Sequence, residues 1–397
     1  MEIPEDYIYL DHNATTPMRP ETIAEIQKAL HVHGNPSSSH LLGQKSKELL
    51  KGYRKMVGDA FNVEPEFVVF TSGGTETNNT VIRLSVDRFL ELGNNMKPVV
   101  FTSKMEHPSI LNCLENLATN DIIEVKYFPI NENGIVEYQN ISNELLPRTA
   151  LVTIMFANNE TGVIQPVNDI FDHFKRKAIE NGVTFQPIFH TDASQIIGRV
   201  PLPTPFAFDL MTVTGHKFGG PCSGALIATN NETIKALKRH PLFFGGGQEF
   251  GIRSGTENLP MIAGLAAAIK AAVENVADFD FVQELRNYFE KELEEKFNAK
   301  SFFETSPRLP NTASIVFPDL KITASELLEK CNTVFAASTG AACHANTVMA
   351  SPCLVACGRT TEEAIRTVRF SLGQENTKSQ IDKVVTTLNE QFSSLKT

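Results

Sequence analysis

One lysine in this chain has sequence surroundings that favour nucleophilic chemistry. Lys217 lies in the run Thr212-Val-Thr-Gly-His-Lys-Phe-Gly-Gly-Pro221, directly after the apolar segment Phe208-Asp-Leu-Met-Thr-Val213. A lysine held in a glycine-bounded turn after a buried strand loses hydration around its amine, which lowers its pKa and makes it nucleophilic. This predicts a Schiff base with an aldehyde, and the usual protein-bound aldehyde is pyridoxal phosphate (PLP). The alternative is a solvated lysine on the surface, and the other motifs of the chain have to distinguish the two interpretations.

Two polar motifs that follow other apolar runs could hold such a cofactor. The segment Thr71-Ser-Gly-Gly-Thr-Glu-Thr-Asn-Asn79 opens a helix-like stretch, so its backbone N–H groups and the hydroxyl of Thr75 could bind a phosphate. Asp192, in Phe189-His-Thr-Asp-Ala-Ser-Gln195, could pair with a protonated pyridine nitrogen and reach the same pocket as Lys217 from a neighbouring strand. A plain strand-to-helix turn and a helix N-cap are the alternatives.

Two further motifs contribute an imidazole and amide donors. Met105-Glu-His-Pro-Ser109 places His107 where its ring could stack on a cofactor, and Asn158-Asn-Glu-Thr-Gly162 supplies side-chain amides. Each motif alone also fits an ordinary polar loop. Four such segments, each after an apolar run, favour one cofactor site.

Three later motifs complete the candidate residues. The Gly-rich loop Gly245–Glu257 contains Thr256. Cys343, among small residues in Thr339-Gly-Ala-Ala-Cys-His344, is typical of a reactive thiol, with a buried structural cysteine as the alternative. Arg369 interrupts an apolar strand-like run and therefore needs an anionic partner, for which a substrate carboxylate would serve.

The elements that must position these residues alternate between strand-like and helix-like segments through the first two thirds of the chain. Short apolar segments rich in Val, Ile and Phe suit strands that are buried on both faces, and their alternation with amphipathic stretches such as Glu21–Leu30 predicts a mostly parallel sheet covered by helices. In that first helix we expect Ile23, Ile26 and Leu30 to form the apolar stripe. The predicted strands are Phe67–Phe70, Val99–Thr102, Ile123–Phe128, Ala150–Phe156, Ile188–Thr191, Phe208–Val213 and Gly224–Ala228.

After Thr256 the pattern changes to one typical of a smaller α+β domain. Helices are expected over Met261–Val276, Asp280–Phe297, Ala324–Cys331 and Lys378–Leu395, and strands over Thr312–Phe317 and Ile365–Leu372. We therefore predict an N-terminal segment of the small domain over residues 1–15, a large PLP-binding domain over 16–260 and a small C-terminal domain over 261–397.

Composition narrows the classes of function. With 397 residues, two domains are expected, and a net charge of -10 argues against nucleic-acid or anionic-membrane binding. Neither a membrane-spanning run nor a targeting segment stands out, so we expect a cytoplasmic protein. The six cysteines predict neither a disulfide framework nor a common zinc site, and we interpret Cys353 and Cys357 as buried small hydrophobes.

Together these motifs resemble the class V aminotransferase family of fold type I PLP-dependent transferases, nearly end to end from Tyr9-Leu-Asp-His-Asn-Ala-Thr-Thr-Pro17 to Phe370-Ser-Leu-Gly373. The resemblance implies that Lys217 forms the Schiff base, that Asp192 pairs with the ring nitrogen and that Arg369 binds the substrate α-carboxylate. It also implies that Cys343 is the catalytic cysteine. The other implied roles are phosphate binding by Gly74, Thr75, Thr214 and His216, contact with the ring or substrate by His107, Asn159 and Gln195, and substrate binding by His344.

The resemblance further implies a homodimer, since the threonine that matches Thr256 reaches the phosphate of the partner subunit in that family. Within the family the chain is similar to the branch of cysteine desulfurases and selenocysteine lyases. Desulfurases usually carry Ser or Thr after the catalytic cysteine, whereas the Ala-Ala-Cys-His run around Cys343 resembles the lyases. The family often has Arg where this chain has Gln374, so contacts there are in question.

This branch implies removal of selenium from L-selenocysteine to give L-alanine, with Lys217 taking the α-proton and Cys343 protonating or capturing the selenium. The alternative is a cysteine desulfurase that passes a Cys343 persulfide to a sulfur-accepting protein for iron–sulfur or thio-cofactor assembly. A catalytically silent binding module is disfavoured because Lys217, Asp192 and Arg369 are all present. No metal is expected.

Overall fold

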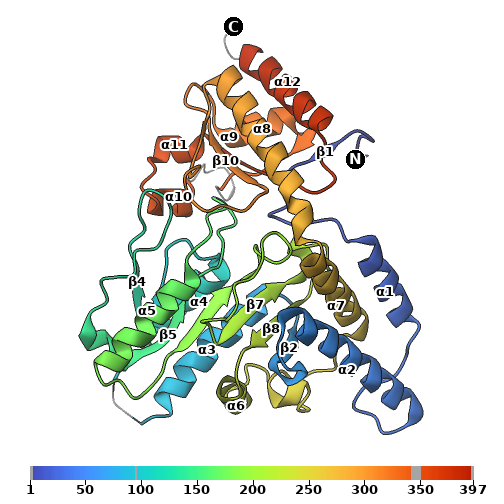
Figure 1. Ribbon diagram of the computed structural model, residues 1–397, viewed down its shortest axis with the longest axis vertical. Helices are drawn as coiled ribbons and strands as arrows, with labels where there is room; N and C mark the ends of the chain where they lie inside the picture. The colour runs from blue at the N-terminus through green and yellow to red at the C-terminus, as the bar shows by residue number, and fades with distance from the viewer. Residues whose placement is uncertain (1–2, 94–95, 341–349, 395–397) are drawn as a thin grey trace.

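A seven-stranded sheet forms the centre of the larger part of the molecule (Figure 1). The computed structural model describes residues 3–93, 96–340 and 350–394. The sheet consists of β2 (Val68–Thr71), β3 (Val99–Thr102), β4 (Glu124–Tyr127), β5 (Thr149–Thr153), β6 (Ile188–Asp192), β7 (Leu210–Thr214) and β8 (Gly224–Ala228). Its order is β2-β8-β7-β6-β5-β3-β4, in which β8 runs antiparallel to both neighbours and the other pairs are parallel. Each predicted strand overlaps one of these, so the mostly parallel seven-stranded sheet is confirmed.

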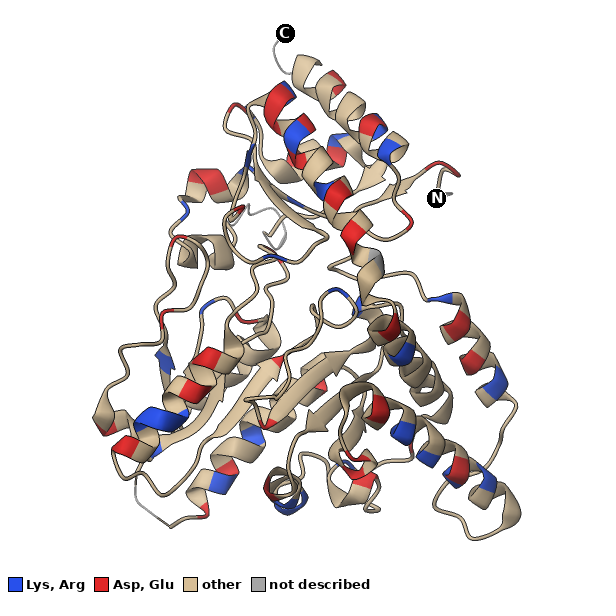
Figure 2. Ribbon diagram, in the orientation of Figure 1, with Lys and Arg blue, Asp and Glu red and all other residues tan. Residues whose placement is uncertain are grey.

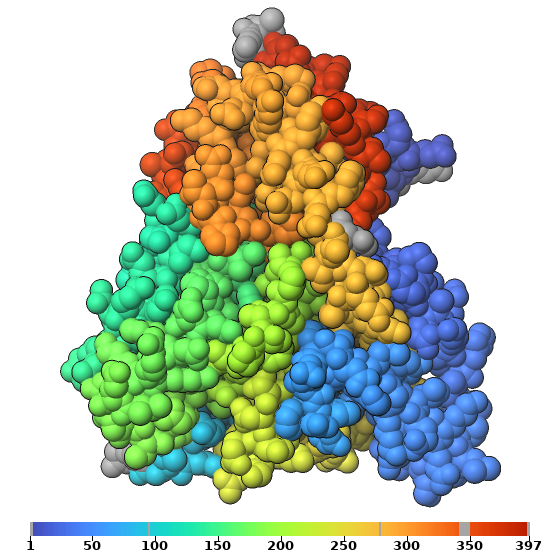
Figure 3. All heavy atoms as spheres, viewed as in Figure 1, coloured from blue at the N-terminus to red at the C-terminus, as the bar shows by residue number. Residues whose placement is uncertain are grey.

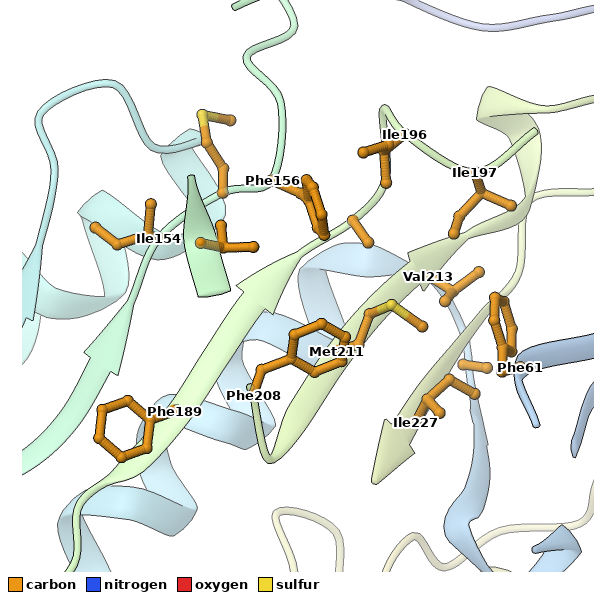
Figure 4. Close-up of a cluster of buried hydrophobic side chains, with 14 of the residues drawn as sticks. Phe61, Ile154, Phe156, Phe189, Ile196, Ile197, Phe208, Met211, Val213 and Ile227 are labelled. Carbon is orange, nitrogen blue, oxygen red and sulfur yellow. The ribbon is translucent and has the colours of Figure 1, made fainter. Parts of the chain in front are cut away.

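Six of the seven strands are fully buried because helices cover both faces of this sheet, whereas β4 at its edge is only partly buried. Successive side chains of a strand point to opposite faces, so Val68 and Phe70 pack in one core cluster and Val69 in another. Figure 4 shows the first cluster, in which Phe189, Met211 and other side chains of adjacent strands gather on one face. The helices of this part are α1 (Pro20–Leu30), α2 (Leu41–Phe61), α3 (Gly74–Leu90), α4 (Pro108–Thr119), α5 (Val167–Glu180), α6 (Asn231–Arg239) and α7 (Leu259–Glu274).

The predicted apolar stripe of α1 is only partly right. Ile26 is buried, but Ile23 and Leu30 are exposed, and the buried stripe is completed by Thr22 and Ala29. The reason is the close packing of α1 against α7, where a Cβ on Gly264 would lie 2.5 Å from the Ile26 side chain. Small residues allow that approach, so they occupy the interface.

The C-terminal segments form a second, smaller lobe that also contains both chain termini (Figures 1 and 3). Its sheet has the order β12-β10-β9 and is antiparallel, while β1 and β11 pair in parallel. Its strands are β1 (Ile8–Tyr9), β9 (Lys300–Ser301), β10 (Thr312–Val316), β11 (Phe335–Ala336) and β12 (Thr367–Ser371), and its helices are α8 (Phe279–Phe297), α9 (Ala324–Cys331), α10 (Pro352–Ala356), α11 (Thr361–Ile365) and α12 (Lys378–Ser394).

The core clusters correspond to the two lobes, but no single point in the sequence separates the residues of one cluster from those of the other. Ile8 and Leu10 from the N-terminal segment pack with the smaller lobe, whereas the apolar face of α7 packs with the larger one. Phe302 and Leu354, both late in the chain, also join the larger cluster. The domain boundaries at residues 15 and 260 therefore stay a prediction.

Charged residues are concentrated on the helices, and the strands of the central sheet carry few of them (Figure 2). Over the residues that the structure describes, no single helix is both long and apolar enough to cross a membrane; α7 and α8 meet those criteria only as a pair bent by 74°.

Candidate active site

A cavity of about 480 Å³ opens at the edge of the large sheet where β6 and β7 end. Parallel strands present their carboxyl ends at one edge of a sheet, which is where open α/β folds bind ligands. The smaller lobe closes the cavity through Arg369 on β12. The lining includes most of the predicted site residues, namely Gly74, Thr75, His107, Asn159, Asp192, Gln195, Thr214, His216, Lys217 and Arg369.

Lys217 ends the short 3₁₀ turn Gly215–Lys217, which follows β7 directly. Its Nζ donates to the backbone carbonyls of Asn13 at 2.9 Å and Ala14 at 2.8 Å. Burial lowers the pKa of this amine to about 8, and the positive charges of Arg199 and Arg369 act in the same direction. The structure thus provides the desolvated lysine that the sequence predicts.

Asp192 is the last residue of β6 and is 6% exposed. One of its carboxylate oxygens, Oδ2, accepts from Asn78 Nδ2 at 2.9 Å. The other, Oδ1, accepts from the backbone N–H of Ser194 at 3.0 Å and from the Ser194 hydroxyl at 2.5 Å. These donors fix the carboxylate as a hydrogen-bond acceptor at the floor of the cavity.

Residues 72–75, at the start of α3, form a cradle that suits an anion. A helix leaves its first N–H groups without intrahelical partners, and they attract negative charge. Gly73 has a φ of 155°, which only glycine adopts readily, and a Cβ on Gly74 would lie 2.3 Å from Thr214 Oγ1. A side chain at Gly74 would therefore obstruct the space between α3 and β7 that a phosphate needs.

Two histidines line the cavity in neutral form. Burial lowers the pKa of His216 to about 4, and the neighbouring Lys217 and His107 act in the same direction. Desolvation also lowers the pKa of His107, whose Nδ1 lies 2.8 Å from Ser109 Oγ and accepts from the Ser109 N–H, capping α4. A neutral imidazole held by its own helix turn is suited to ring stacking.

Arg369 is buried and is held by both lobes. It donates to Asp11 Oδ1 at 2.5 Å and to the backbone carbonyl of Asn159 at 3.0 Å. Its Nε is buried without a hydrogen-bond partner among the described residues. A buried donor left open in this way fits an anionic ligand such as a carboxylate.

Gln195 reaches the cavity with both ends of its side-chain amide engaged. Its Nε2 donates to the Asn13 carbonyl at 3.0 Å, and its Oε1 accepts from Arg199. The ring contact that the resemblance implies for Gln195 stays a prediction.

Sequence reasoning missed Arg199, Asn78 and Ser194. Arg199 is buried and donates to the backbone carbonyls of Gln195 at 3.0 Å and Lys217 at 3.1 Å, so it ties the two cofactor motifs together. The sequence did contain a signal for Arg199: like Arg369, it is an arginine next to apolar residues, which predicts a buried charge that needs partners. Asn78 and Ser194 lie within the motifs already examined, but nothing local shows that both turn toward Asp192.

Among the predicted site residues that the structure describes, Thr256 is not brought into this cavity. Thr256 is exposed and does not line the cavity of the single chain, and its role toward a partner subunit stays a prediction. Cys343 and His344 lie outside the described residues. Cys353 and Cys357 are buried, as predicted, and no cluster of three or more His, Cys, Asp or Glu side chains suited to a metal occurs in the described ranges.

Comparisons with known proteins agree with the site. A sequence profile described as aminotransferase class-V matches residues 8–384. The selenocysteine lyase of Rattus norvegicus is 36% identical, covering 99% of this chain and 96% of its own. The cysteine desulfurase IscS of Methanosarcina thermophila is 34% identical, covering 96% and 91%. A solved structure titled NifS-like protein superposes with a TM-score of 0.83 at 30% identity and covers 98% of this chain and 99% of its own.

Enzymes of the matched family depend on PLP, and the residues present fit it. The anion cradle at α3, the Asp192 carboxylate and the desolvated Lys217 amine correspond to the phosphate, the ring nitrogen and the aldehyde carbon of that cofactor. The fold type I architecture and the PLP cofactor expected from the sequence are therefore confirmed.

Proposed function

The chain belongs to the class V aminotransferase family, and we propose that this PLP-dependent enzyme is a selenocysteine lyase that converts L-selenocysteine to L-alanine. The observation that best supports an amino-acid substrate is that Arg369 and Lys217 line the same cavity. An open guanidinium donor for an α-carboxylate thus shares a site with an amine for the α-proton.

The preference for selenium is supported by the relatives and by the residues around Cys343. Curated selenocysteine lyases from rat and cattle align over nearly the whole chain at 36% and 37% identity. The Ala-Ala-Cys-His run is the lyase-like form of the motif. A selenol is already ionised at neutral pH, so a site for selenocysteine does not need to deprotonate the leaving atom.

The residues of this chain divide the work as follows. Arg369 orients the substrate carboxylate, and the uncharged form of Lys217 takes the α-proton. When bound, PLP supplies the electron sink that stabilises the resulting carbanion. Cys343 then receives the selenium, so that L-selenocysteine and one thiol give L-alanine and one S–SeH group, with no external electrons needed. Reductants or an acceptor protein regenerate the thiol.

The first test is turnover of L-selenocysteine and L-cysteine by the purified holoenzyme, measured as alanine together with released selenide or sulfide. The proposal expects strong preference for selenocysteine, with cysteine bound but slowly converted. Cys343→Ala should lower selenium release by about 10²-fold or more, as loss of a catalytic proton donor or nucleophile does. Cys222→Ala is the matched control, because this exposed cysteine lines the same cavity and has no assigned role.

The second candidate is a cysteine desulfurase, favoured by the IscS relatives at 34% and 35% identity. It predicts comparable turnover of both substrates and a persulfide on Cys343, detected by mass spectrometry, that Cys222→Ala leaves in place. Full selenium release by Cys343→Ala would exclude both roles for that thiol.

The proposal also includes a homodimer with shared sites and a location in the cytoplasm. In the proposed homodimer, Thr256 of one subunit reaches the phosphate that the partner subunit binds. Mixing inactive Lys217→Ala with Thr256→Ala should then give heterodimers whose activity differs from the mean of the parents. A reducing compartment is supported by the five described cysteines, none of which forms a disulfide with another described residue.

A further inference from the structure

A line of buried hydrogen bonds crosses the large sheet and ends on Asp192. Thr153 Oγ1 on β5 lies 2.8 Å from His190 Nδ1 on β6, and His190 Nε2 lies 3.0 Å from Thr212 Oγ1 on β7. Thr212 Oγ1 donates to Asn78 Oδ1 on α3 at 2.8 Å, and Asn78 Nδ2 donates to Asp192 Oδ2 at 2.9 Å. All five side chains are at most 6% exposed.

The chemistry of these groups fixes the direction of every bond. A carboxylate oxygen only accepts, so the Asn78 amide nitrogen faces Asp192 and its oxygen faces Thr212. The Asn78 amide oxygen also only accepts, so the Thr212 hydroxyl donates its one proton to Asn78. Thr212 must therefore accept from His190, which requires the proton on Nε2. A neutral ring then accepts at Nδ1 from Thr153.

His190 is well placed to remain neutral. Burial lowers its pKa to about 4, and the nearby Asp192 charge offsets this only in part. A protonated ring would carry a proton on Nδ1 as well and would lose the hydrogen bond donated by Thr153. The tautomer is thus set from both sides by the strands next to β6.

We infer that Thr153, His190, Thr212 and Asn78 form a one-directional hydrogen-bond relay that orients the Asp192 carboxylate and stabilises its charge, with His190 as a positioning residue in its Nε2–H form. Aligned hydrogen bonds strengthen one another in a low-dielectric interior. The relay reaches Asp192 from inside the sheet, and of its four members only Asn78 lines the cavity. It is therefore independent of whether the enzyme prefers selenocysteine or cysteine.

The tautomer can be measured directly on the apoenzyme and the holoenzyme. In ¹⁵N NMR of protein labelled in histidine, with His190 assigned by His190→Gln, we expect one nitrogen protonated and one unprotonated from pH 5.5 to 9. The proton should lie on Nε2. A proton on Nδ1, or a doubly protonated ring near pH 6, would overturn the relay.

A matched set of threonine variants tests what the relay does. Thr212→Val removes the central hydroxyl while keeping the shape of the side chain, and it should weaken PLP binding by about tenfold, the effect of losing a hydrogen bond that supports a charge. Thr212→Ser restores the hydroxyl and should recover most of the affinity. Thr191→Val is the control, since this buried hydroxyl on the neighbouring strand β6 has no hydrogen-bond partner among the residues described.

The measured quantity is the dissociation constant for PLP binding to the apoenzyme. Thermal unfolding is recorded separately to show that each variant is folded. Equal PLP affinity of Thr212→Val and Thr191→Val would show that the hydroxyl has only a structural role. If Thr212→Val does not fold, Thr153→Val at the far end of the relay, with a smaller expected loss, replaces it.

Discussion

The two halves of the cavity are built in different ways. The cofactor half lies at one edge of one sheet, where Asp192 ends β6 and Lys217 follows the adjacent β7. The Asp192 carboxylate accepts three hydrogen bonds, from Asn78 and Ser194, and the Lys217 amine donates to the carbonyls of residues 13 and 14. The substrate half joins separate lobes, since Arg369 on β12 is held by Asp11 and the Asn159 carbonyl.

The halves also differ in how completely their polar groups are satisfied. The Asp192 carboxylate accepts several hydrogen bonds, whereas Arg369 Nε has no partner among the described residues. A satisfied network holds a group in one geometry, whereas an unpaired buried donor gains from binding a new acceptor. In the proposed function, the sheet edge holds the cofactor and the junction between the lobes binds the substrate.

The largest expected effect is on the cofactor half. Lys217→Ala removes the only amine that the cavity offers for the α-proton within the described residues, so kcat should fall by about 10³-fold or more. The visible absorbance of the bound cofactor should change as well. Lys175→Ala is the control, because that half-buried lysine also donates to a backbone carbonyl but lies outside the cavity. Retained turnover in Lys217→Ala would contradict the assignment.

A smaller and more selective effect is expected on the substrate half. Arg369→Lys keeps the charge but loses the planar fork of donors, so kcat/KM should fall by about 10–100-fold. The dissociation constant of PLP should stay close to that of the wild type. Arg308→Lys removes a similar fork from an ion pair with Glu290 in the smaller lobe and should leave kcat/KM unchanged. If Arg369→Lys lost PLP affinity and kcat/KM by equal factors, Arg369 would act on the cofactor as well, and the two halves of the cavity would not have separate roles.

The smallest expected effect concerns Glu106, which lies behind the cofactor half next to His107. Burial raises the pKa of Glu106 to about 8, and its Oε1 accepts from Ser103 Oγ and the Met155 N–H. Its contribution to stability is fully present below the ordinary pKa near 4.5 and is lost as the pH rises through 8, since the unfolded state ionises first.

Glu106→Gln removes this titration while keeping the accepting oxygen. The Tm of the variant minus that of the wild-type apoenzyme should rise by about 5 °C between pH 5 and pH 8.5, measured by thermal unfolding at both pH values. The comparison between the two pH values cancels any constant cost of the new amide. An unchanged difference in Tm would show that Glu106 is already ionised at pH 5.

The sequence alone determined the large sheet and the cofactor half of the site. Strands buried on both faces are rich in apolar residues, so the six fully buried strands were visible as short apolar runs, while the edge strand β4 is only partly buried and carries Glu124 and Lys126. Polar residues that end parallel strands lie along one edge of a sheet, which places Asp192 and Lys217 on the same edge, and the pairing of β6 with β7 brings them close together.

The tertiary structure alone decided which polar groups satisfy one another across distant segments. The pairing of Arg369 with Asp11, the hydrogen bond from Arg199 to the Lys217 carbonyl and the relay from Thr153 to Asp192 join residues that no local pattern connects. Periodicity reports which face of an element is buried, as the partly wrong stripe of α1 shows, but not what lies against it. Hydrogen bonds depend on distances below about 3.5 Å, and only the packed lobes set those distances.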